Sequence, residues 1–293
     1  MQTVLRVVFT VLGQLPLGLL HALGAGLGRL LWRLPNRFRA ITMLHLERCL
    51  PDAAPEARHR IARASLMASG QAIFEAPAIW YGPDRRLRRW LDDTSALQTI
   101  RDAHAQGRGV ILLTPHQGAW ELASFFCAQV APLTVLYKPQ KGAADAVIRD
   151  GRARWPTVTP VPTTGAGVKA LLSALKRGEM VGILPDHDPP ESSGTVFAPL
   201  FGMPANTMDL VTKLAARTGA PVLFIVAERL PRAAGFCFRL WPAPAAIADA
   251  AHGPAALNEG VEACVRALPE QYWWSYRRYR RRPPGEPDFY RSR

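Results

Sequence analysis

From Gly109 onward the chain alternates short apolar runs with segments of helical periodicity, and this alternation leaves few folds open. The runs have the length of buried strands and cover Val110–Leu113, Thr134–Tyr137, Thr157–Val161, Met180–Leu184, Val222–Val226 and Phe236–Leu240. Helical spacing marks Trp120–Val130, Ala143–Arg152, Gly167–Arg177, Thr207–Thr218 and Leu257–Leu268, and the stretch Pro185–Asn206 is expected to be a loop. Strands that alternate with helices predict an α/β fold with a mixed, mostly parallel central sheet flanked by helices.

His116 and Glu121 stand at the first strand-to-helix junction, in the sequence Thr114-Pro115-His116-Gln117-Gly118-Ala119-Trp120-Glu121. Strand ends and helix starts face one crevice in α/β proteins, which makes this turn a candidate catalytic site. On one continuous helix, two residues five apart point roughly 140° away from each other. The two side chains therefore meet only if His116 lies in the turn and Glu121 in the first helical turn. Such a pair would be a base with an orienting carboxylate, and the alternative is a structural histidine.

Asp186, His187 and Asp188 directly follow another predicted strand and are expected to face the same crevice. They also suggest a metal site, but no second cluster offers a further ligand, so we expect no metal. A turn rich in Asp and Pro is the ordinary alternative.

Four more residues are candidates for substrate binding. Arg149 and Arg152 lie near a predicted helix end and suit phosphate or carboxylate groups, unless they belong to a solvated helix face. Phe201 and Gly202 suit the wall of an acyl-chain site, or ordinary packing.

The N-terminal segment from Val7 to Gly28 contains no Lys, Arg, Asp or Glu. It is long enough to cross a bilayer, which needs roughly 20 residues, and Arg29, Arg33, Arg37 and Arg39 follow directly. Positive charge after an apolar segment favours a cytoplasmic location for that side. We expect a membrane-anchor or interfacial helix over residues 1–30, with a cleaved signal or a soluble core helix as alternatives. Residues 31–105 are then a helical membrane-proximal region and residues 106–293 an α/β core.

The formal net charge of +13 is unusual for a chain of 293 residues and indicates an anionic partner. The stretch Pro269–Pro283 adds a dense mixture of Trp, Tyr and Arg to this charge. It could bind nucleic acid, but we prefer the interpretation of a membrane-surface belt. In such a belt, Trp and Tyr lie at the bilayer interface and Arg contacts anionic head groups. The run Arg85–Trp90 is either a solvated face or a second contact with head groups.

Several common enzyme classes are disfavoured. There is no P-loop and no Gly-x-Ser-x-Gly elbow, which argues against a nucleotide triphosphatase and a serine hydrolase of the usual α/β kind. Gly165-Ala166-Gly167-Val168-Lys169-Ala170 imitates a dinucleotide fingerprint, but the strand before it is short and interrupted by prolines. The four cysteines form no Cys-x-x-Cys pair and no disulfide framework.

Three blocks together resemble the bacterial lipid A late acyltransferases, within the lysophospholipid and glycerolipid acyltransferases. His116–Glu121 resembles their His-x-x-x-x-Asp/Glu motif, Leu184–Asp186 with Phe201–Ala205 resembles a Pro-Asp-Gln … Phe-Gly-x-Pro-Ala block, and Pro269–Tyr279 resembles a Pro-Glu-Gln-Tyr … Arg-Arg signature. The chain departs from the pattern at Gln117, at His187 where Gln is usual, and at His45 where Asn is common.

The resemblance implies a glycerolipid acyltransferase-like fold on the cytoplasmic face of a bacterial inner membrane. It implies transfer of a fatty acyl chain from acyl carrier protein to a hydroxyl of a lipid A precursor, without a cofactor. His116 would act as general base and Glu121 would orient it. Arg149 or Arg152 would bind acceptor phosphate or the oxyanion, Asp186 would hold an arginine or a sugar hydroxyl, and amides near Gly118 would stabilise the oxyanion.

Three alternatives stay open. One is an acyltransferase of another lipid, such as a lysophospholipid, an ornithine lipid or a glycolipid. Another is a non-enzymatic protein that binds membranes or nucleic acid through its basic tail, although we expect no nucleic acid partner. A hydrolase that passes the acyl group to water is a third possibility.

Overall fold

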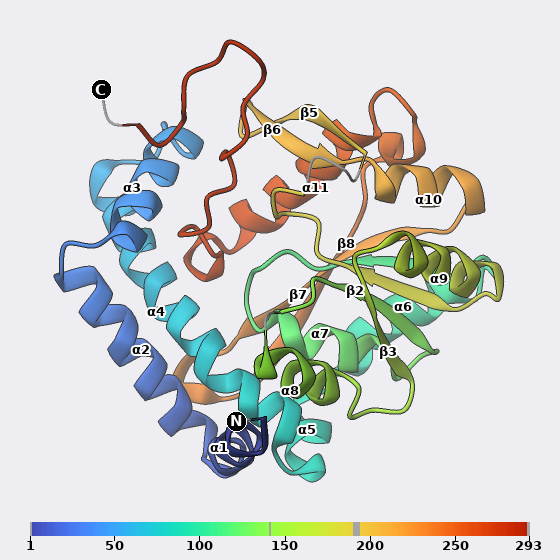
Figure 1. Ribbon diagram of the computed structural model, residues 1–293, viewed down its shortest axis with the longest axis horizontal. Helices are drawn as coiled ribbons and strands as arrows, with labels where there is room; N and C mark the ends of the chain where they lie inside the picture. The colour runs from blue at the N-terminus through green and yellow to red at the C-terminus, as the bar shows by residue number, and fades with distance from the viewer. Residues whose placement is uncertain (1, 141, 190–193, 292–293) are drawn as a thin grey trace.

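The computed structural model describes residues 2–140, 142–189 and 194–291, and it shows an α/β core beside a layer of long helices (Figure 1). The main sheet has six strands in the order β3-β2-β4-β1-β7-β8, parallel except for β8. Its strands are β1 Val110–Leu113, β2 Leu133–Tyr137, β3 Val158–Pro162, β4 Met180–Ile183, β7 Val222–Arg229 and β8 Phe236–Pro242. The predicted mixed, mostly parallel sheet is confirmed.

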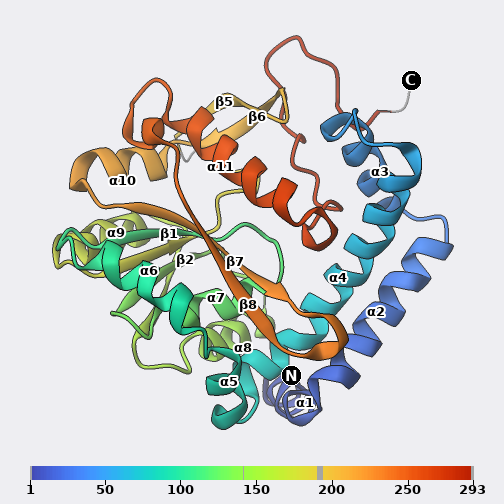
Figure 2. The same cartoon turned by 180° about the vertical axis from the view of Figure 1, so that it is seen from behind.

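Both faces of the sheet are covered, so alternate residues of β1 pack into different clusters. Val110 and Leu112 pack into the cluster that holds α6 (Thr94–His104) and α7 (Trp120–Cys127). Ile111 and Leu113 pack into the cluster of α9 (Gly165–Lys176), α10 (Leu210–Thr218) and α11 (Gly253–Ala267). Helix α8 (Ala143–Arg152) connects β2 to β3. Helix α11 lies beside β7 (Figure 2).

The helices before the core are α1 Gln2–Gln14, α2 Leu17–Arg33, α3 Arg37–Cys49, α4 Pro55–Tyr81 and α5 Asp84–Trp90. Helices α1 and α2 meet at a bend of 113° around Pro16, because proline interrupts helical hydrogen bonding. Among the described helices no single one is long and apolar enough to cross a membrane, although α1 and α2 together satisfy length and composition. The predicted membrane-anchor helix is therefore not confirmed.

Helix α2 lies along α4 (Figure 1), and glycines allow the close approach. A Cβ atom on Gly24 would lie 2.5 Å from the backbone of Gln71, and one on Gly28 would lie 2.4 Å from the Cα of Met67. The glycines of the uncharged segment thus serve packing between helices. The outer faces of α1 and α2 remain apolar and exposed, as at Val4, Val11, Leu30 and Leu34, which are 52–66% accessible.

The predicted loop 185–206 contains most of a β-hairpin, which the sequence analysis missed; residues 190–193 lie outside the described chain. Strands β5 (Thr195–Leu200) and β6 (Met203–Met208) pair antiparallel, with Leu200 opposite Met203. Phe201 and Gly202 form the two-residue turn, and both have positive φ angles, of 49° and 71°, as a type I′ turn requires. Prolines within both strands conceal the alternation by which a strand is recognised.

The C-terminal segment after α11 is part of the core, which contradicts its prediction as a membrane-surface belt. Tyr272, Trp274, Arg278 and Tyr279 are all less than 9% accessible. Two guanidinium groups of this segment bond backbone carbonyls of β6: Arg278 to Asn206 (2.6 Å) and Arg282 to Pro204 (2.8 Å). These buried aromatic and basic residues therefore tie the end of the chain to the core, whereas Arg277 and Arg280 are exposed.

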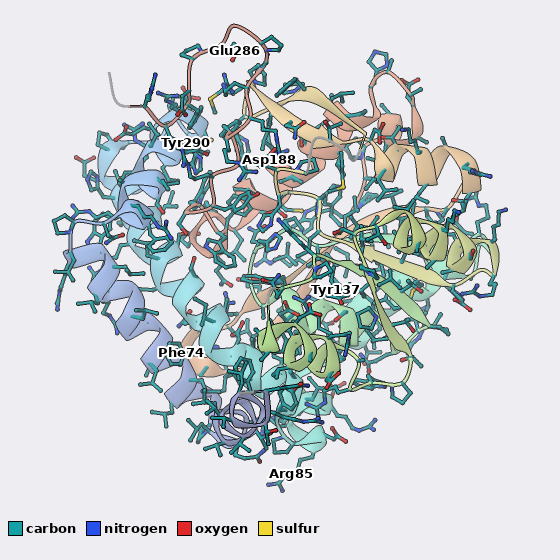
Figure 3. The ribbon with its side chains drawn as sticks, viewed as in Figure 1. Phe74, Arg85, Tyr137, Asp188, Glu286 and Tyr290 are labelled. Carbon is teal, nitrogen blue, oxygen red and sulfur yellow. The ribbon has the colours of Figure 1, made fainter. Side chains whose placement is uncertain are left out.

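The basic run of α5 divides cleanly into two faces. Leu87 and Trp90 are buried, whereas Arg85, Arg88 and Arg89 are exposed, and Arg85 points away from the protein in Figure 3. Exposed arginines on one face fit both interpretations, a solvated face and a contact with head groups.

Candidate active site

The turn between β1 and α7 is held by neighbours on two sides. From the C-terminal segment, the Trp273 amide donates to the His116 carbonyl (3.0 Å), and the Gly118 amide donates to the Gln271 carbonyl (3.0 Å). From β7, the Ala227 carbonyl accepts from the Ala119 amide at 2.8 Å. Gly118 has a φ of +60°, and a Cβ there would lie 2.1 Å from the Ala227 carbonyl oxygen, so only glycine fits.

The side chain of His116 is held by Asp186, which follows β4. Asp186 is 2% accessible, and its carboxylate accepts both from His116 Nδ1 (2.8 Å) and from the His116 amide (3.0 Å). Burial opposes ionisation of Asp186, but the facing imidazole and its hydrogen bonds outweigh burial and hold the pKa of Asp186 below its usual range. An ionised carboxylate only accepts hydrogen bonds. Nδ1 therefore carries the proton, and Nε2 is left as the basic nitrogen.

Glu121 does not make the predicted contact with His116. Its carboxylate accepts from Arg152 Nε (2.9 Å), from a second Arg152 nitrogen, and from Trp80 Nε1 (3.2 Å). Burial would raise the pKa of Glu121, but the charge and hydrogen bonds of Arg152 lower it below the usual value. The physical reason is position, because Glu121 lies in the first turn of α7 and is directed to α4 and α8, while Nδ1 is already bonded to Asp186. A catalytic role for Glu121 stays a prediction.

A cavity of about 880 Å³ runs from this turn into the core beside the sheet. His116, Trp120, Glu121 and Arg152 contribute its polar and aromatic end. Its remaining walls are mainly apolar or small and come from β1, α7, β2, α8 and β4: Leu112, Ala123, Cys127, Leu133, Val135, Ile148 and Gly182, among others. Tyr137 and Asp188, labelled in Figure 3, also contribute to the lining. The cavity has the volume and the mainly apolar lining that a hydrocarbon chain requires.

The other predicted substrate-binding residues divide into two groups. Arg152 lines the cavity, but two of its nitrogens already bond Glu121. Arg149 is about half exposed, lies 3.8 Å from Asp150 and does not line the cavity. Phe201 and Gly202 form the hairpin turn, where Phe201 packs on Trp274, and they are not part of the cavity wall. A role for them as an acyl-chain wall stays a prediction.

The metal alternative for Asp186–Asp188 receives no support. Asp188 bonds Asn206 Nδ2 (2.8 Å) and Arg281 (2.8 Å), and Asp186 is committed to His116. Within residues 2–140, 142–189 and 194–291, no group of three or more His, Cys, Asp and Glu side chains is arranged to hold an ion.

Aromatic rings around His116 form the part of the site that sequence reasoning missed. The His187 ring stacks on the His116 ring with centroids 3.5 Å apart and planes at 3°, and Tyr276 covers the other face of His187 at 3.8 Å. Trp120 lies against His116 at 5.4 Å and stacks on Trp273 at 5.1 Å. Only the departure at His187 marked this arrangement in the sequence.

A buried ion network lies behind the turn. Arg229 at the end of β7 pairs with Glu75 of α4 (2.6 Å) and donates to the Gly118 carbonyl (2.7 Å). Glu75 also bonds His21 of α2 at 2.8 Å. Burial would raise the pKa of Glu75, but Arg229 and His21 lower it. The network thus connects the N-terminal helices to the backbone of the catalytic turn.

Comparison with known proteins gives one consistent picture. Residues 3–281 match the sequence model of the family described as bacterial lipid A biosynthesis acyltransferase. The lipid A biosynthesis lauroyltransferase of Escherichia coli (strain K12) is 32% identical over 283 residues, covering 94% of this chain and 90% of that protein. The palmitoleoyltransferase of the same strain is 28% identical, with the same coverage, and its myristoyltransferase is 25% identical over 92% of this chain and 83% of that protein.

Proposed function

The chain belongs to the bacterial lipid A biosynthesis acyltransferase family, and we propose that it transfers a fatty acyl chain from acyl carrier protein to a hydroxyl of a lipid A precursor. The observation that carries the proposal is the hydrogen bond between His116 and the buried Asp186 at the polar end of an 880 Å³ apolar cavity. A base and a chain-binding cavity that meet at one point suit acyl transfer.

The reaction begins at His116. Nε2 accepts the proton of the acceptor hydroxyl while the oxygen attacks the thioester carbonyl carbon. Asp186 keeps the proton on Nδ1 and stabilises the imidazolium that results. The carbon–sulfur bond of the tetrahedral intermediate then breaks, and the imidazolium returns its proton to the departing thiolate. Atoms and charge balance without a cofactor.

Backbone amides at the helix start near Gly118 were expected to hold the oxyanion, and the hydrogen bonds of the turn narrow the choice among them. The amides of His116, Gly118 and Ala119 are already bonded, to Asp186, Gln271 and Ala227 respectively. In the described chain, the amides of Trp120 and Glu121 have no backbone acceptor. They belong to the first turn of α7, where the helix dipole favours negative charge, and we assign the oxyanion to them.

Direct transfer is favoured over an acyl-enzyme. Cys127 and Ser124 line the cavity. Burial raises the pKa of Cys127, which keeps it a thiol, and the Ser124 hydroxyl donates to the Glu121 carbonyl at 3.2 Å. Neither is activated by a base.

The ion pair of Glu121 and Arg152 has a different role from the one first expected. Arg152 stays cationic, because Glu121 outweighs the effect of burial and raises its pKa. We propose that this pair orients the acceptor head group through the planar guanidinium of Arg152. Glu121 holds that guanidinium in place, and it lies 5.7 Å from the ring of Trp80. Arg149 lies outside the cavity and is not needed for this step.

The partners follow from charge and exposed apolar surface. A chain of net charge +13 suits an acidic acyl carrier protein and an anionic lipid acceptor. The exposed apolar residues of α1 and α2 adjoin Arg29, Arg33 and Arg37, a composition typical of helices that lie in a membrane interface. We therefore propose attachment to the cytoplasmic face of the bacterial inner membrane, with α1 and α2 in contact with lipid.

The test is transfer by the purified chain in detergent, with acyl carrier protein carrying acyl chains of defined length and a lipid A precursor as acceptor. Mass spectrometry should show one acyl mass added to the precursor. His116→Ala should lose transfer, whereas His252→Ala, the same change at an exposed histidine, should retain it. An active His116→Ala variant would refute the assignment of the base.

The same assay separates the rivals. Addition to a lysophospholipid or glycolipid in preference to the precursor would support a different acceptor, and free fatty acid in the absence of acceptor would support a hydrolase. A non-enzymatic role of the basic tail is disfavoured by the burial of its Trp274, Arg278 and Tyr279 side chains.

A further inference from the structure

The rings of His116, His187 and Tyr276 form a continuous stack beside the cavity. The centroid distances are 3.5 and 3.8 Å, and the interplanar angles are 3° and 13°. The Tyr276 hydroxyl accepts from the Asp188 amide at 3.0 Å, which fixes the outer ring of the stack. The inner ring is fixed by Asp186. His187 is thus clamped between two anchored rings.

The overlap of the two imidazoles is informative. Two neutral aromatic rings prefer offset or edge-to-face arrangements to a close face-to-face overlap. A cation over an aromatic face is attracted instead, and the attraction grows when the pair is desolvated. The geometry of His116 on His187 therefore suits a state in which one ring is charged and the other is neutral.

The surroundings decide which ring stays neutral. Burial lowers the pKa of His187 to about 3, helped by the positive charge of His116 and opposed by Asp186. Its buried Nε2 has no hydrogen-bond partner among the described residues. His116, by contrast, has the carboxylate of Asp186 on its Nδ1 at 2.8 Å. The ionisable groups that face the pair are Asp186, Glu121, Lys138, Tyr276 and Arg278.

We propose that His187 is a positioning residue: its ring, clamped by Tyr276, fixes the plane of the His116 ring and stabilises the imidazolium formed during transfer. This inference rests on the proposed function, in which His116 is the base. It gives a physical role to His187, one of the positions at which the chain departs from the pattern that it resembles.

The test compares His187→Phe, which keeps a ring without ionisable nitrogens, with His187→Leu, which removes the ring. We expect kcat to fall roughly tenfold in His187→Leu, with KM for both substrates within about twofold. The acidic limb of the pH profile of kcat should also move to lower pH, because the imidazolium is less stable. His187→Phe should keep the position of that limb and most of kcat.

Equal losses in both variants with an unmoved acidic limb would reduce His187 to a packing residue and overturn the proposal. A wild-type kcat in His187→Leu would also overturn it. If the His187 variants fail to fold, Tyr276→Leu and Tyr276→Phe make the same comparison from the outer ring.

A second measurement is independent of the reaction. Histidine side-chain NMR follows the titration of His116 without substrate, and its midpoint should be lower in His187→Leu than in the wild type and in His187→Phe. If the wild-type protein showed these midpoints but transferred no acyl chain, the proposed function would be contradicted, whereas the effect of His187 on His116 would stand. Identical midpoints in all three proteins would overturn the proposal that the His187 ring stabilises the His116 imidazolium.

Discussion

Replacing Asp186 by Asn tests which carboxylate orients the base. Two donors, the amide and Nδ1 of His116, converge on the two oxygens of Asp186. Asn offers one oxygen and one NH2 group, so it can accept from only one of them. If the NH2 group faces Nδ1, the imidazole must place its own proton on Nε2 and can no longer act as base.

The magnitude follows from the burial of the pair. Removing one partner of a buried charge pair costs about 3–5 kcal/mol, and Asp186 is 2% accessible. The imidazolium exists only in and after the transition state, so the loss falls on kcat. At about 1.4 kcal/mol for each factor of ten, we expect kcat to fall roughly 10²–10⁴-fold, with KM for the acyl donor nearly unchanged.

The assay is the transfer of a defined acyl chain to a lipid A precursor, measured at saturating substrates across pH. Asp249→Asn is the matched control, because Asp249 also bonds a histidine Nδ1 at 2.8 Å, but on the surface. Glu121→Gln should weaken acceptor binding through Arg152 and leave the acidic limb of the pH profile in place. A near-wild-type kcat in Asp186→Asn, together with a displaced acidic limb in Glu121→Gln, would refute the reasoning.

Three further predictions concern the cavity, the fold and the ion network. Gly182→Val should shift preference to shorter acyl chains, because a Cβ there points to Val135 at 3.3 Å. Each excluded methylene costs about 0.8 kcal/mol, or about fourfold in rate, so the loss of roughly two or three methylenes changes relative kcat/KM by roughly 15–60-fold. Product masses on mixed donors would check this shift, and an unchanged distribution would contradict it. Burial lowers the pKa of His45 to about 4 in the folded protein. Below the ordinary histidine pKa, the unfolded state therefore binds more protons than the folded state. The free energy of unfolding falls as the pH drops from that ordinary value toward 4. Urea unfolding should show a loss of about 2 kcal/mol from this residue between pH 7 and 5, and His45→Asn should remove that part. Glu75→Leu should destabilise the protein by about 3–5 kcal/mol, because it leaves the guanidinium of Arg229 buried and unpaired. Thermal unfolding should show that adding Arg229→Met restores part of the lost stability. A double variant that is less stable than Glu75→Leu alone would contradict this explanation.

Much of the fold follows from local patterns in the sequence. Short apolar runs and helical spacing mark the strands of the main sheet and helices such as α8, whose bounds Ala143–Arg152 agree with the prediction. The hairpin β5–β6 was missed because its prolines resemble loop composition and because its turn places Phe201 at a positive φ, which side chains with a Cβ seldom adopt.

Composition was a poor guide to location at the C-terminal end of the chain. Trp, Tyr and Arg suit a membrane interface, and they also suit a core in which guanidinium groups bond backbone carbonyls. Arg278 does the latter with the carbonyl of Asn206. At the other end of the chain, only the structure shows what two glycines of the uncharged segment do: Gly24 and Gly28 allow α2 to pack closely on α4.

The sequence by itself determined that a histidine stands at the end of a buried strand, directly before a helix, because that information is local. The tertiary structure alone decided which carboxylate reaches it. Strands β1 and β4 are parallel neighbours, with Leu113 opposite Ile183, so residues that follow each strand emerge at the same edge of the sheet. Asp186 therefore meets His116 across 70 positions of sequence, whereas Glu121, five positions away, is carried by the first turn of α7 toward Arg152.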